Sequence, residues 1–280
     1  MDSKTDDHIL YLTKLSRYFR RQVIKMVYKA QSGHIGGSLS CAEILTVLYF
    51  SEMRVDPANS HWEDRDRFVA SKGHCAPMLY AVLAKRGFFP EEELLTLRTL
   101  GSRLQGHPNM STIKGVDIST GSLGMGLSVG LGMAISARLL GKGFYTYVLM
   151  GDGELQEGQV WESAMSASKF CVDNCIAIVD HNKVQLDGKV DDIMPLGDLA
   201  LKWRSFGWNV IEADGHDVQD LLKAINHAKS VKKTPSVIIA DTVKGKGVSF
   251  MENNHKWHGA VIGKDDYESA MRELGGEADD

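Results

Sequence analysis

Histidine follows glycine four times in this chain, at His34, His74, His107 and His216. With 28 Gly and 10 His among 280 residues, chance predicts about one such pair. A glycine lets the backbone turn sharply before the imidazole, a group suited to binding hydroxyls and moving protons near neutral pH. One such pair usually belongs to a structural loop, but three of these lie between predicted elements of the first half and favour a shared polar site.

A Gly-Asp-Gly sequence at 151–153 directly follows an apolar segment at 144–150, and Asn182 stands at the end of the next one. Neighbouring parallel strands joined by one helix end at the same sheet edge, so oxygens of Asp152 and Asn182 can reach one hard cation. The glycines and the start of a helix expected at 156–170 supply backbone N–H groups for a phosphate. The two sequences together predict Mg²⁺ or Ca²⁺ bridging a diphosphate, although each alone also fits a plain turn.

Two other glycine-rich segments fit no nucleotide-binding pattern. After the segment 120–126, Val129 stands where a dinucleotide fingerprint needs its third glycine. Gly-Lys-Gly at 245–247 lacks the Lys-Ser/Thr pair of a Walker loop. The glycines at 126 and 130 also suit close packing of a helix.

The elements that must position these residues are helical in the first half. Apolar residues three and four apart predict a helix over 8–30 that stops at 32–33. Ser40 and Glu43 form a capping-box pattern, which predicts a helix that starts there and runs to about residue 53. Further helices are expected at 75–86, 90–98 and 124–140.

The second half alternates between short β-rich segments and helical ones. The near-continuous apolar character of the strands predicts an α/β fold, a doubly wound and mainly parallel sheet with helices on both faces. Ligands of such sheets bind at the carboxyl ends of strands, here in the loops after residues 150, 179 and 241. The expected strands are 144–150, 175–179, 208–213 and 236–241, and the expected helices are 156–170, 196–206 and 218–230.

Composition excludes several classes of protein. A net charge of −4 argues against a nucleic-acid binder, and no apolar segment approaches the roughly 20 residues that span a bilayer. The first residues show no signal peptide, and the four cysteines form neither a disulfide framework nor a convincing zinc pattern. We therefore expect a cytoplasmic protein with reduced thiols, built as a single domain over 1–280 with a helical lead-in and an acidic tail at 277–280.

Together these sequences resemble the transketolase family. The segment 151–158, with Asn182 thirty residues after Asp152, is similar to the signature of thiamine diphosphate enzymes. Five further blocks resemble the transketolase branch, occur in transketolase order and extend the resemblance from about residue 10 to 265. These blocks are Ser-Gly-His-Ile-Gly-Gly-Ser at 32–38, Lys-Gly-His at 72–74, Gly-His-Pro at 106–108, Thr-Gly-Ser-Leu-Gly at 120–124 and His-Gly at 258–259.

The resemblance implies which residues hold thiamine diphosphate. Its diphosphate would carry Mg²⁺ or Ca²⁺ bound by Asp152, Asn182 and the backbone carbonyl of Val184. Three further groups would contact the diphosphate itself, namely the Gly153 amide, His74 and His258. The backbone of a glycine-rich segment would line the aminopyrimidine, at Gly121, Ser122 and Leu123.

The resemblance also implies which residues take part in the reaction. Glu157 and Glu162 resemble the acidic residues that link paired active sites through a proton and hydrogen-bond network. Three positions depart from the common family pattern and suggest a divergent branch: Ile35, Cys75 and Ser122. Four imidazoles would surround the reacting carbons and the ketose hydroxyls, those of His34, His74, His107 and His258.

The function implied is transfer of a two-carbon ketol unit from a ketose, phosphorylated by default, to an aldose acceptor. A typical transketolase is more than twice as long, and its second domain supplies the glutamate that activates the aminopyrimidine and the arginines that bind substrate phosphate. Since this chain ends about twenty residues after His258, it resembles the diphosphate-binding subunit of a split transketolase. It would be active only with a pyrimidine-binding partner, in a heterotetramer.

Alternatives stay open at this point. The α-type subunit of a 2-oxoacid dehydrogenase is also a split thiamine diphosphate protein, but the blocks at 32–37 and 106–108 argue against it and against a deoxyxylulose-phosphate synthase fragment. A non-catalytic cofactor-binding module is less favoured because all four imidazoles are retained. The donor and acceptor sugars, whether phosphorylated, sulfonated or other, are not indicated, since the anion-binding residues are expected on the partner.

Overall fold

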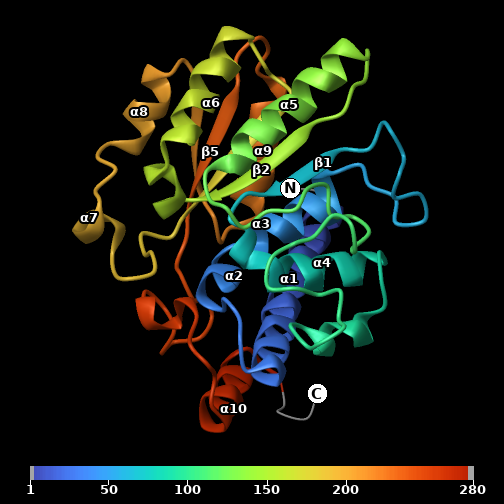
Figure 1. Cartoon of the computed structure of the whole chain (residues 1–280), viewed down its shortest axis with the longest axis vertical. Helices are drawn as coiled ribbons and strands as arrows, with labels where there is room; N and C mark the ends of the chain where they lie inside the picture. Colours follow the sequence, from blue (N-terminus) through green and yellow to red (C-terminus); the bar gives the residue numbers. More distant parts are fainter. Residues whose placement is uncertain (1–2, 277–280) are drawn as a thin grey trace.

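A five-stranded sheet forms the centre of the computed structural model, which describes residues 3–276 (Figure 1). All neighbouring strands run parallel, in the order β1-β2-β3-β5-β4. The predicted doubly wound α/β fold is therefore confirmed, and the four expected strands lie within two residues of their predicted bounds. The strands are β1 Arg67–Ala70, β2 Thr146–Gly151, β3 Cys175–His181, β4 Asn209–Asp214 and β5 Ser236–Asp241.

The sequence did not predict β1, the strand at one edge of the sheet. It pairs with β2 from Arg67 opposite Thr146 to Ala70 opposite Leu149. Four residues are too few to show the alternation from which a strand is recognised.

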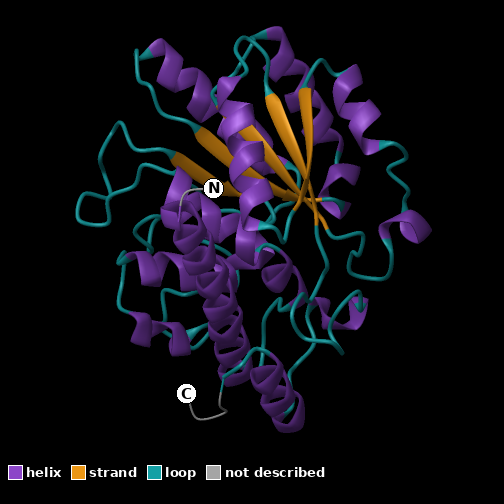
Figure 2. Ribbon diagram, turned by 180° about the vertical axis from the view of Figure 1, so that it is seen from behind, coloured by secondary structure: helices purple, strands orange, loops and turns teal. Residues whose placement is uncertain are grey.

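Alternate residues of each strand face two different helical layers. In β2, Val148 and Met150 pack into one buried cluster, whereas Tyr147 and Leu149 pack into the other. Figure 2 shows the sheet from behind, where one helix of the second layer crosses in front of the strands and the others lie mainly below them. The first layer contains α5 Met125–Leu139, α6 Gly158–Lys169 and α8 Leu199–Ser205, and the second contains α1 Ser3–Ala30, α3 Ala42–Val47, α4 Ala76–Arg86, α9 Val218–Ser230 and α10 Lys264–Glu273.

The capping box predicted at Ser40 and Glu43 is wrong. Ser40 is the last residue of the short helix α2 (Gly36–Ser40), and α3 begins after Cys41 with no side-chain cap. Both side chains are buried and find stronger partners in other elements, because the Ser40 hydroxyl donates to Asp180 and Glu43 pairs with Arg20. A π-helical turn, Leu48–Glu52, carries the chain to the predicted end near residue 53.

Short turns of 3₁₀ helix replace parts of two predicted helices. The segment expected at 90–98 forms only Glu91–Thr96, and Gly153–Gln156 precedes α6, so that the α-helix starts at Gly158 instead of residue 156. Besides β1, the sequence did not predict five elements: the 3₁₀ turns Gly73–Cys75 and His255–His258 and the helices α2, α7 Val190–Ile193 and α10.

Two further expectations concern membrane-spanning segments and disulfides. Within residues 3–276, no helix combines the length and the apolar character that crossing a bilayer requires. The four cysteines are unpaired, and Cys41, Cys75 and Cys175 are buried. The acidic tail at 277–280 lies outside the described residues.

Candidate active site

The sheet brings the ends of β2 and β3 together. Gly151 pairs with Asp180, and the Asp152 amide donates to the Asp180 carbonyl at 3.3 Å, so Asp152 and Asn182 follow neighbouring strands at one edge. This is the placement predicted from the strand–helix–strand spacing. Both residues line a cavity of about 360 Å³, a volume typical of sites for small ligands.

The cavity gathers most of the residues singled out in the sequence. Ser122 and Glu162 do not line it, and both are exposed. The predicted residues in its wall are His34, His74, His107, Gly121, Leu123, Asp152, Gly153, Glu157, Asn182, Val184 and His258. Those not predicted are Lys72, Gly151, Glu154, Gln156, Gln185, Leu186 and Lys244.

Four imidazoles from four separate segments meet in this cavity. The ring centroid of His34 lies 5.6 Å from that of His74, 5.7 Å from that of His107 and 5.5 Å from that of His258. The centroids of His74 and His258 are 5.2 Å apart. Three of the four Gly-His pairs thus share one site, while His216 lies elsewhere.

The four imidazoles are neutral near pH 7. Burial, with the charges of Arg98 and His107, lowers the pKa of His34 to about 4, and burial beside Lys244 lowers the pKa of His258 to about 3. Burial likewise lowers the pKa of His74 and that of His107. A neutral ring carries one N–H donor and one acceptor nitrogen. In His34 the acceptor Nδ1 already faces Arg98, and in His258 it faces Lys244, so these two rings offer a bound molecule their Nε2–H.

Arg98 fixes the tautomer of His34. Its guanidinium Nη2 lies 3.2 Å from Nδ1 of His34, and its Nη1 donates to the Ser32 hydroxyl at 3.0 Å. Because a guanidinium only donates hydrogen bonds, Nδ1 accepts and the proton of the neutral ring sits on Nε2. Sequence reasoning missed Arg98, which follows a 3₁₀ turn and carries no motif of its own.

A buried ion pair supports the cavity from behind. Lys72 and Asp180 are almost fully buried and paired, and the Lys72 ammonium also donates to the Gly37 carbonyl at 2.8 Å. Asp180 accepts further bonds from the hydroxyls of Ser40 and Thr242. Burial alone would raise the pKa of Asp180, but Lys72 and these bonds lower it. This carboxylate is therefore fully compensated within the chain.

Asp152 is buried without such compensation. It accepts backbone bonds from Gly153 at 2.8 Å and Lys183 at 2.5 Å, but among the described residues it has no ion pair. Burial, together with the charge of Asp180, raises the pKa of Asp152 to about 6. A cation beside this carboxylate would remove the cost of burying it.

The oxygens near Asp152 suit a hard cation that is bound partly by the protein and partly by the phosphates of a bound molecule. The side-chain oxygen of Asn182 and the carbonyl of Val184 belong to the same loop, where the Val184 amide donates to Asn182 Oδ1 at 3.2 Å. Within residues 3–276, no group of three or more His, Cys, Asp or Glu side chains could hold a metal by itself. One carboxylate, one amide oxygen and one carbonyl match Mg²⁺, which is usually bound with substrate phosphates and water.

Lys244 is a cationic group of the cavity that sequence reasoning missed. It is 2% exposed, and its Nζ lies 2.8 Å from both the Val184 carbonyl and Nδ1 of His258. Burial and the charge of Lys72 lower the pKa of Lys244 to about 8. The signal available was its place in the loop after residue 241, one of the three loops expected to bind ligands.

The glycine-rich segment forms one wall of the cavity. Gly121 has a φ of +148°, and a Cβ atom there would lie 3.2 Å from Cγ of His107. The neighbouring Thr120 hydroxyl is buried without a hydrogen-bond partner. Leu123 remains 38% exposed at the cavity, and Glu157, at the N-cap of α6, is exposed as well.

Comparison with known protein families gives one match over nearly the whole chain. Residues 13–280 match the family described as transketolase, thiamine diphosphate binding domain. The chain is 44% identical over 255 residues to an apulose-4-phosphate transketolase subunit of Phocaeicola vulgatus, covering 91% of this chain and 90% of that protein. It is 43% identical over 255 residues to the 6-deoxy-6-sulfo-D-fructose transketolase subunit SqwG of Clostridium sp. (strain MSTE9), covering 91% and 93%.

Longer relatives match over part of their length. The chain is 42% identical to human transketolase over 90% of this chain and 40% of that one. Its fold superposes on transketolase from Leishmania mexicana with a TM-score of 0.92 at 31% identity, over 96% of this chain and 42% of the other. The chain thus spans about two fifths of the length of these transketolases.

Proposed function

This chain belongs to the transketolase family, and from that premise we propose that it is the diphosphate-binding subunit of a two-subunit transketolase, a transferase. It binds thiamine diphosphate with a divalent ion in the 360 Å³ cavity and, with its partner, transfers a two-carbon ketol unit from a ketose to an aldose. The observation that carries the proposal is the meeting of four neutral imidazoles beside an uncompensated buried carboxylate.

Residues of this chain fit the diphosphate end of the cofactor. Asp152, Asn182 and the Val184 carbonyl would hold the divalent ion, and its charge would compensate the buried Asp152 carboxylate. The Gly153 amide and the imidazoles of His74 and His258 contact the diphosphate, with Lys244 adding a positive charge. Backbone groups of 121–123 line the aminopyrimidine.

The histidines bind and orient the sugar. When bound, thiamine diphosphate supplies the carbanion chemistry by which a bond next to a ketose carbonyl is broken and formed. His34, with its proton on Nε2, donates a hydrogen bond to a sugar oxygen. His107 holds a neighbouring hydroxyl, and its neutral ring can accept or return a proton there. His258, whose Nδ1 accepts from the Lys244 ammonium, donates to another hydroxyl from Nε2 and can give up a proton there.

A partner chain completes the site. Two relatives that match over nine tenths of their length are named as transketolase subunits. At the mouth of the cavity, Leu123 and Leu186 leave 38% and 59% of their surfaces exposed, and Glu157 is also exposed. Glu162, which does not line the cavity, is exposed as well. We place the pyrimidine-binding partner over this mouth, in a heterotetramer in which the two glutamates link paired sites. Residues 1–280 act as a single cofactor-binding unit, in the cytoplasm, where the unpaired cysteines stay reduced.

The donor is a ketose with an anionic group. One relative's name specifies a ketose phosphate, apulose 4-phosphate, and the other a sulfonated one, 6-deoxy-6-sulfo-D-fructose. The imidazole cluster recognises the hydroxyls next to the ketose carbonyl, which both classes share, so this chain binds either. Choice between phosphate and sulfonate belongs to the partner.

The test combines the chain with a pyrimidine-domain protein as its candidate partner, to be sought among the products of neighbouring reading frames. Phosphorylated and sulfonated ketoses are offered with thiamine diphosphate, Mg²⁺ and an aldose acceptor, and release of the shortened aldose is measured. Ketol transfer that needs both chains supports the proposal. Decarboxylation of 2-oxoacids without ketol transfer would instead make the chain an α-type dehydrogenase subunit.

A further inference from the structure

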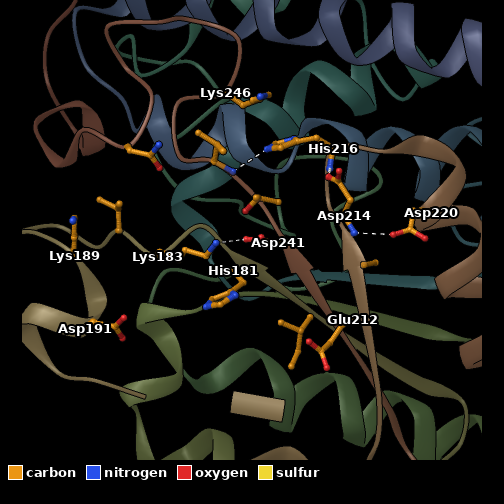
Figure 3. A pocket seen from close by; sticks show the side chains of 16 residues that line it. His181, Lys183, Lys189, Asp191, Glu212, Asp214, His216, Asp220, Asp241 and Lys246 are labelled. Atoms are coloured by element: carbon orange, nitrogen blue, oxygen red, sulfur yellow. Dashed lines mark hydrogen bonds and ion pairs between the residues drawn. The ribbon is translucent and has the colours of Figure 1, made fainter. Parts of the chain in front are cut away.

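The fourth Gly-His pair lies outside the imidazole cluster. His216 follows β4 and borders an open depression of about 1190 Å³ at the carboxyl ends of β3, β4 and β5 (Figure 3). Val184 lines both this depression and the active-site cavity. None of the roles in the proposed reaction involves His216. The hydrogen bonds of His216 therefore indicate what this residue does.

His216 is held in one tautomer between two anchors. Its Nε2 accepts a hydrogen bond from the Val243 backbone N–H at 2.8 Å, drawn as a dashed line in Figure 3. An N–H group can only donate, so Nε2 carries no proton and the proton of the neutral ring sits on Nδ1. That Nδ1 lies 2.9 Å from Oε2 of Glu43. The ring thus links α3 to the loop after β5.

Glu43 is a rigid, charged base for this link. Its carboxylate is paired with Arg20 at 2.5 Å and also accepts the Ser16 hydroxyl at 2.9 Å, and both Glu43 and Arg20 are buried. Burial would raise the pKa of Glu43, but Arg20 and the bond from His216 lower it to about 2. The carboxylate therefore stays ionised and keeps accepting from Nδ1 of His216.

Gly215 brings His216 within reach of the loop. Its amide donates to the Asp241 carbonyl at 2.8 Å. A Cβ atom at this position would lie 2.3 Å from Cγ2 of Thr242 and 3.0 Å from the Asp241 carbonyl oxygen, so a larger residue would push the two segments apart. Both residues of the Gly-His pair are thus required for contact with 241–243.

We propose that Gly215 and His216 clamp the loop 242–247 and thereby position the Lys244 ammonium in the cofactor cavity. Lys244 follows Val243 directly, and its Nζ reaches the Val184 carbonyl and His258 at 2.8 Å. His216 is a positioning residue that acts through Lys244 on cofactor binding, and in this respect the inference rests on the proposed function.

Other bonds limit how far the loop moves when the clamp is lost. On one side of Val243 the Thr242 hydroxyl donates to Asp180, and on the other the Gly245 amide donates to the Gly36 carbonyl at 3.0 Å. Loss of the His216 bond therefore loosens the loop locally and leaves the fold intact. The expected defect is in cofactor affinity, with turnover at saturating cofactor largely kept.

The first test needs only the full chain. Hydrogen exchange of the Val243 and Lys244 amides is compared in wild type, His216→Ala and His227→Ala, a matched control in which an exposed histidine of α9 is removed. Loss of this charge-assisted, partly buried hydrogen-bond chain should speed exchange of Val243 about tenfold or more. The control should match wild type, as should the strand amides in all three proteins. If His216→Ala fails to fold, His216→Phe keeps the ring volume and removes both nitrogens.

The second test is a double-mutant cycle in the complete enzyme with its partner. His216→Ala should raise the apparent Kd for thiamine diphosphate about tenfold, while turnover at saturating cofactor falls less than about threefold. In a Lys244→Met background, His216→Ala should add almost nothing, because the group it positions is already gone. A merely structural role would give the same factor in both backgrounds.

The outcomes separate this inference from the proposed function. Unchanged exchange at Val243, or additive effects on cofactor affinity in an enzyme that performs ketol transfer, overturns the clamp. Faster exchange at Val243 with non-additive effects supports it. If thiamine diphosphate binds but no ketose is cleaved, the proposed reaction fails while the affinity cycle still decides the clamp.

Discussion

Two buried carboxylates lie at the ends of neighbouring strands, and they differ in whether the chain provides a counter-charge. Asp180, which ends β3 beside His181, is paired with Lys72 and accepts bonds from surrounding hydroxyls, and its pKa is lowered. Asp152, directly after β2, is as deeply buried but has only two backbone donors, and its pKa is raised to about 6.

This difference distinguishes a carboxylate with a structural role, Asp180, from one with a functional role, Asp152. A buried charge that the chain compensates by itself stabilises one arrangement of the elements around it. One left uncompensated costs stability, and it lines a cavity in which a cation would remove that cost. The same contrast separates the Lys72–Asp180 ion pair behind the cavity from the groups in its wall. The neutral imidazoles and Lys244 form no ion pair with a carboxylate in the described part of the chain.

The largest effect should come from the imidazoles on the functional side. His258→Ala in the assembled enzyme should lower turnover about 10²–10⁴-fold, since it removes a group that binds the diphosphate and moves protons on the sugar. His74→Ala should act in the same direction. Steady-state ketol transfer measures both, and His255→Ala, an exposed histidine of the same 3₁₀ turn, is the control. Wild-type rates in both variants would remove these residues from the reaction.

Removing the structural carboxylate should unfold the chain more readily. Asp180→Asn leaves the Lys72 ammonium buried without a counter-charge, which should cost about 3–5 kcal/mol of unfolding free energy. Denaturant unfolding of the full chain measures this, with the exposed Asp187→Asn as the matched control. A loss of unfolding free energy no larger than that of the control would show that the Lys72–Asp180 pair does not stabilise this edge of the sheet.

Removing the Asp152 carboxylate should raise the free energy of unfolding, whereas removing that of Asp180 should lower it. The folded pKa of Asp152 lies above its usual 3.8, so the folded chain binds more protons and loses stability as pH rises through the window from about 4 to 6. Above that window Asp152→Asn should stabilise the cofactor-free chain by about 1–2 kcal/mol, less than the full linkage value because the backbone donors lose part of their acceptor.

Unfolding of the cofactor-free chain between pH 4 and 8 checks this sign. The gain from Asp152→Asn should appear as pH rises and should become small near pH 4, where the wild-type carboxyl is protonated in the folded chain and partly protonated in the unfolded one. A variant less stable than wild type at pH 8 would mean that Asp152 is compensated like Asp180.

The smallest effect concerns the tautomer of His34. Arg98→Met removes the donor to Nδ1 and a charge that lowers the pKa of His34, so that pKa should rise. Ketol transfer should fall about tenfold, with Arg98→Lys recovering part of it. NMR titration of the His34 ring follows the pKa, and the exposed Arg17→Met is the control. An unchanged titration would separate Arg98 from the imidazole cluster.

The sequence predicted the parts of this molecule that depend on local pattern. Four strands, the parallel sheet and the placement of Asp152 and Asn182 at one edge follow from apolar segments alternating with helices. The four-residue β1 was too short to show a period, and the apparent capping box failed because tertiary partners took Ser40 and Glu43.

Side chains that act across distant segments were beyond sequence reasoning. Lys244 and Arg98 belong to no recognisable spacing, and their roles depend on the residues that the fold places beside them. Lys72 stood in a recognised block, but its ion pair with Asp180 was not visible in the sequence. His216 shows the reverse case, since its motif was visible but its partners, Glu43 and Val243, were not.

Calorimetric titration of thiamine diphosphate into the complete enzyme tests the central claim most directly. It is run with Mg²⁺ and with chelator, for wild type, Asp152→Asn and the control Asp187→Asn. Wild type and control should bind tightly only with Mg²⁺, while Asp152→Asn should lose about 100-fold or more in affinity, as expected on loss of a metal ligand. Equal affinity without the divalent ion, or in Asp152→Asn, would contradict the assignment of this strand edge to a metal-bound diphosphate.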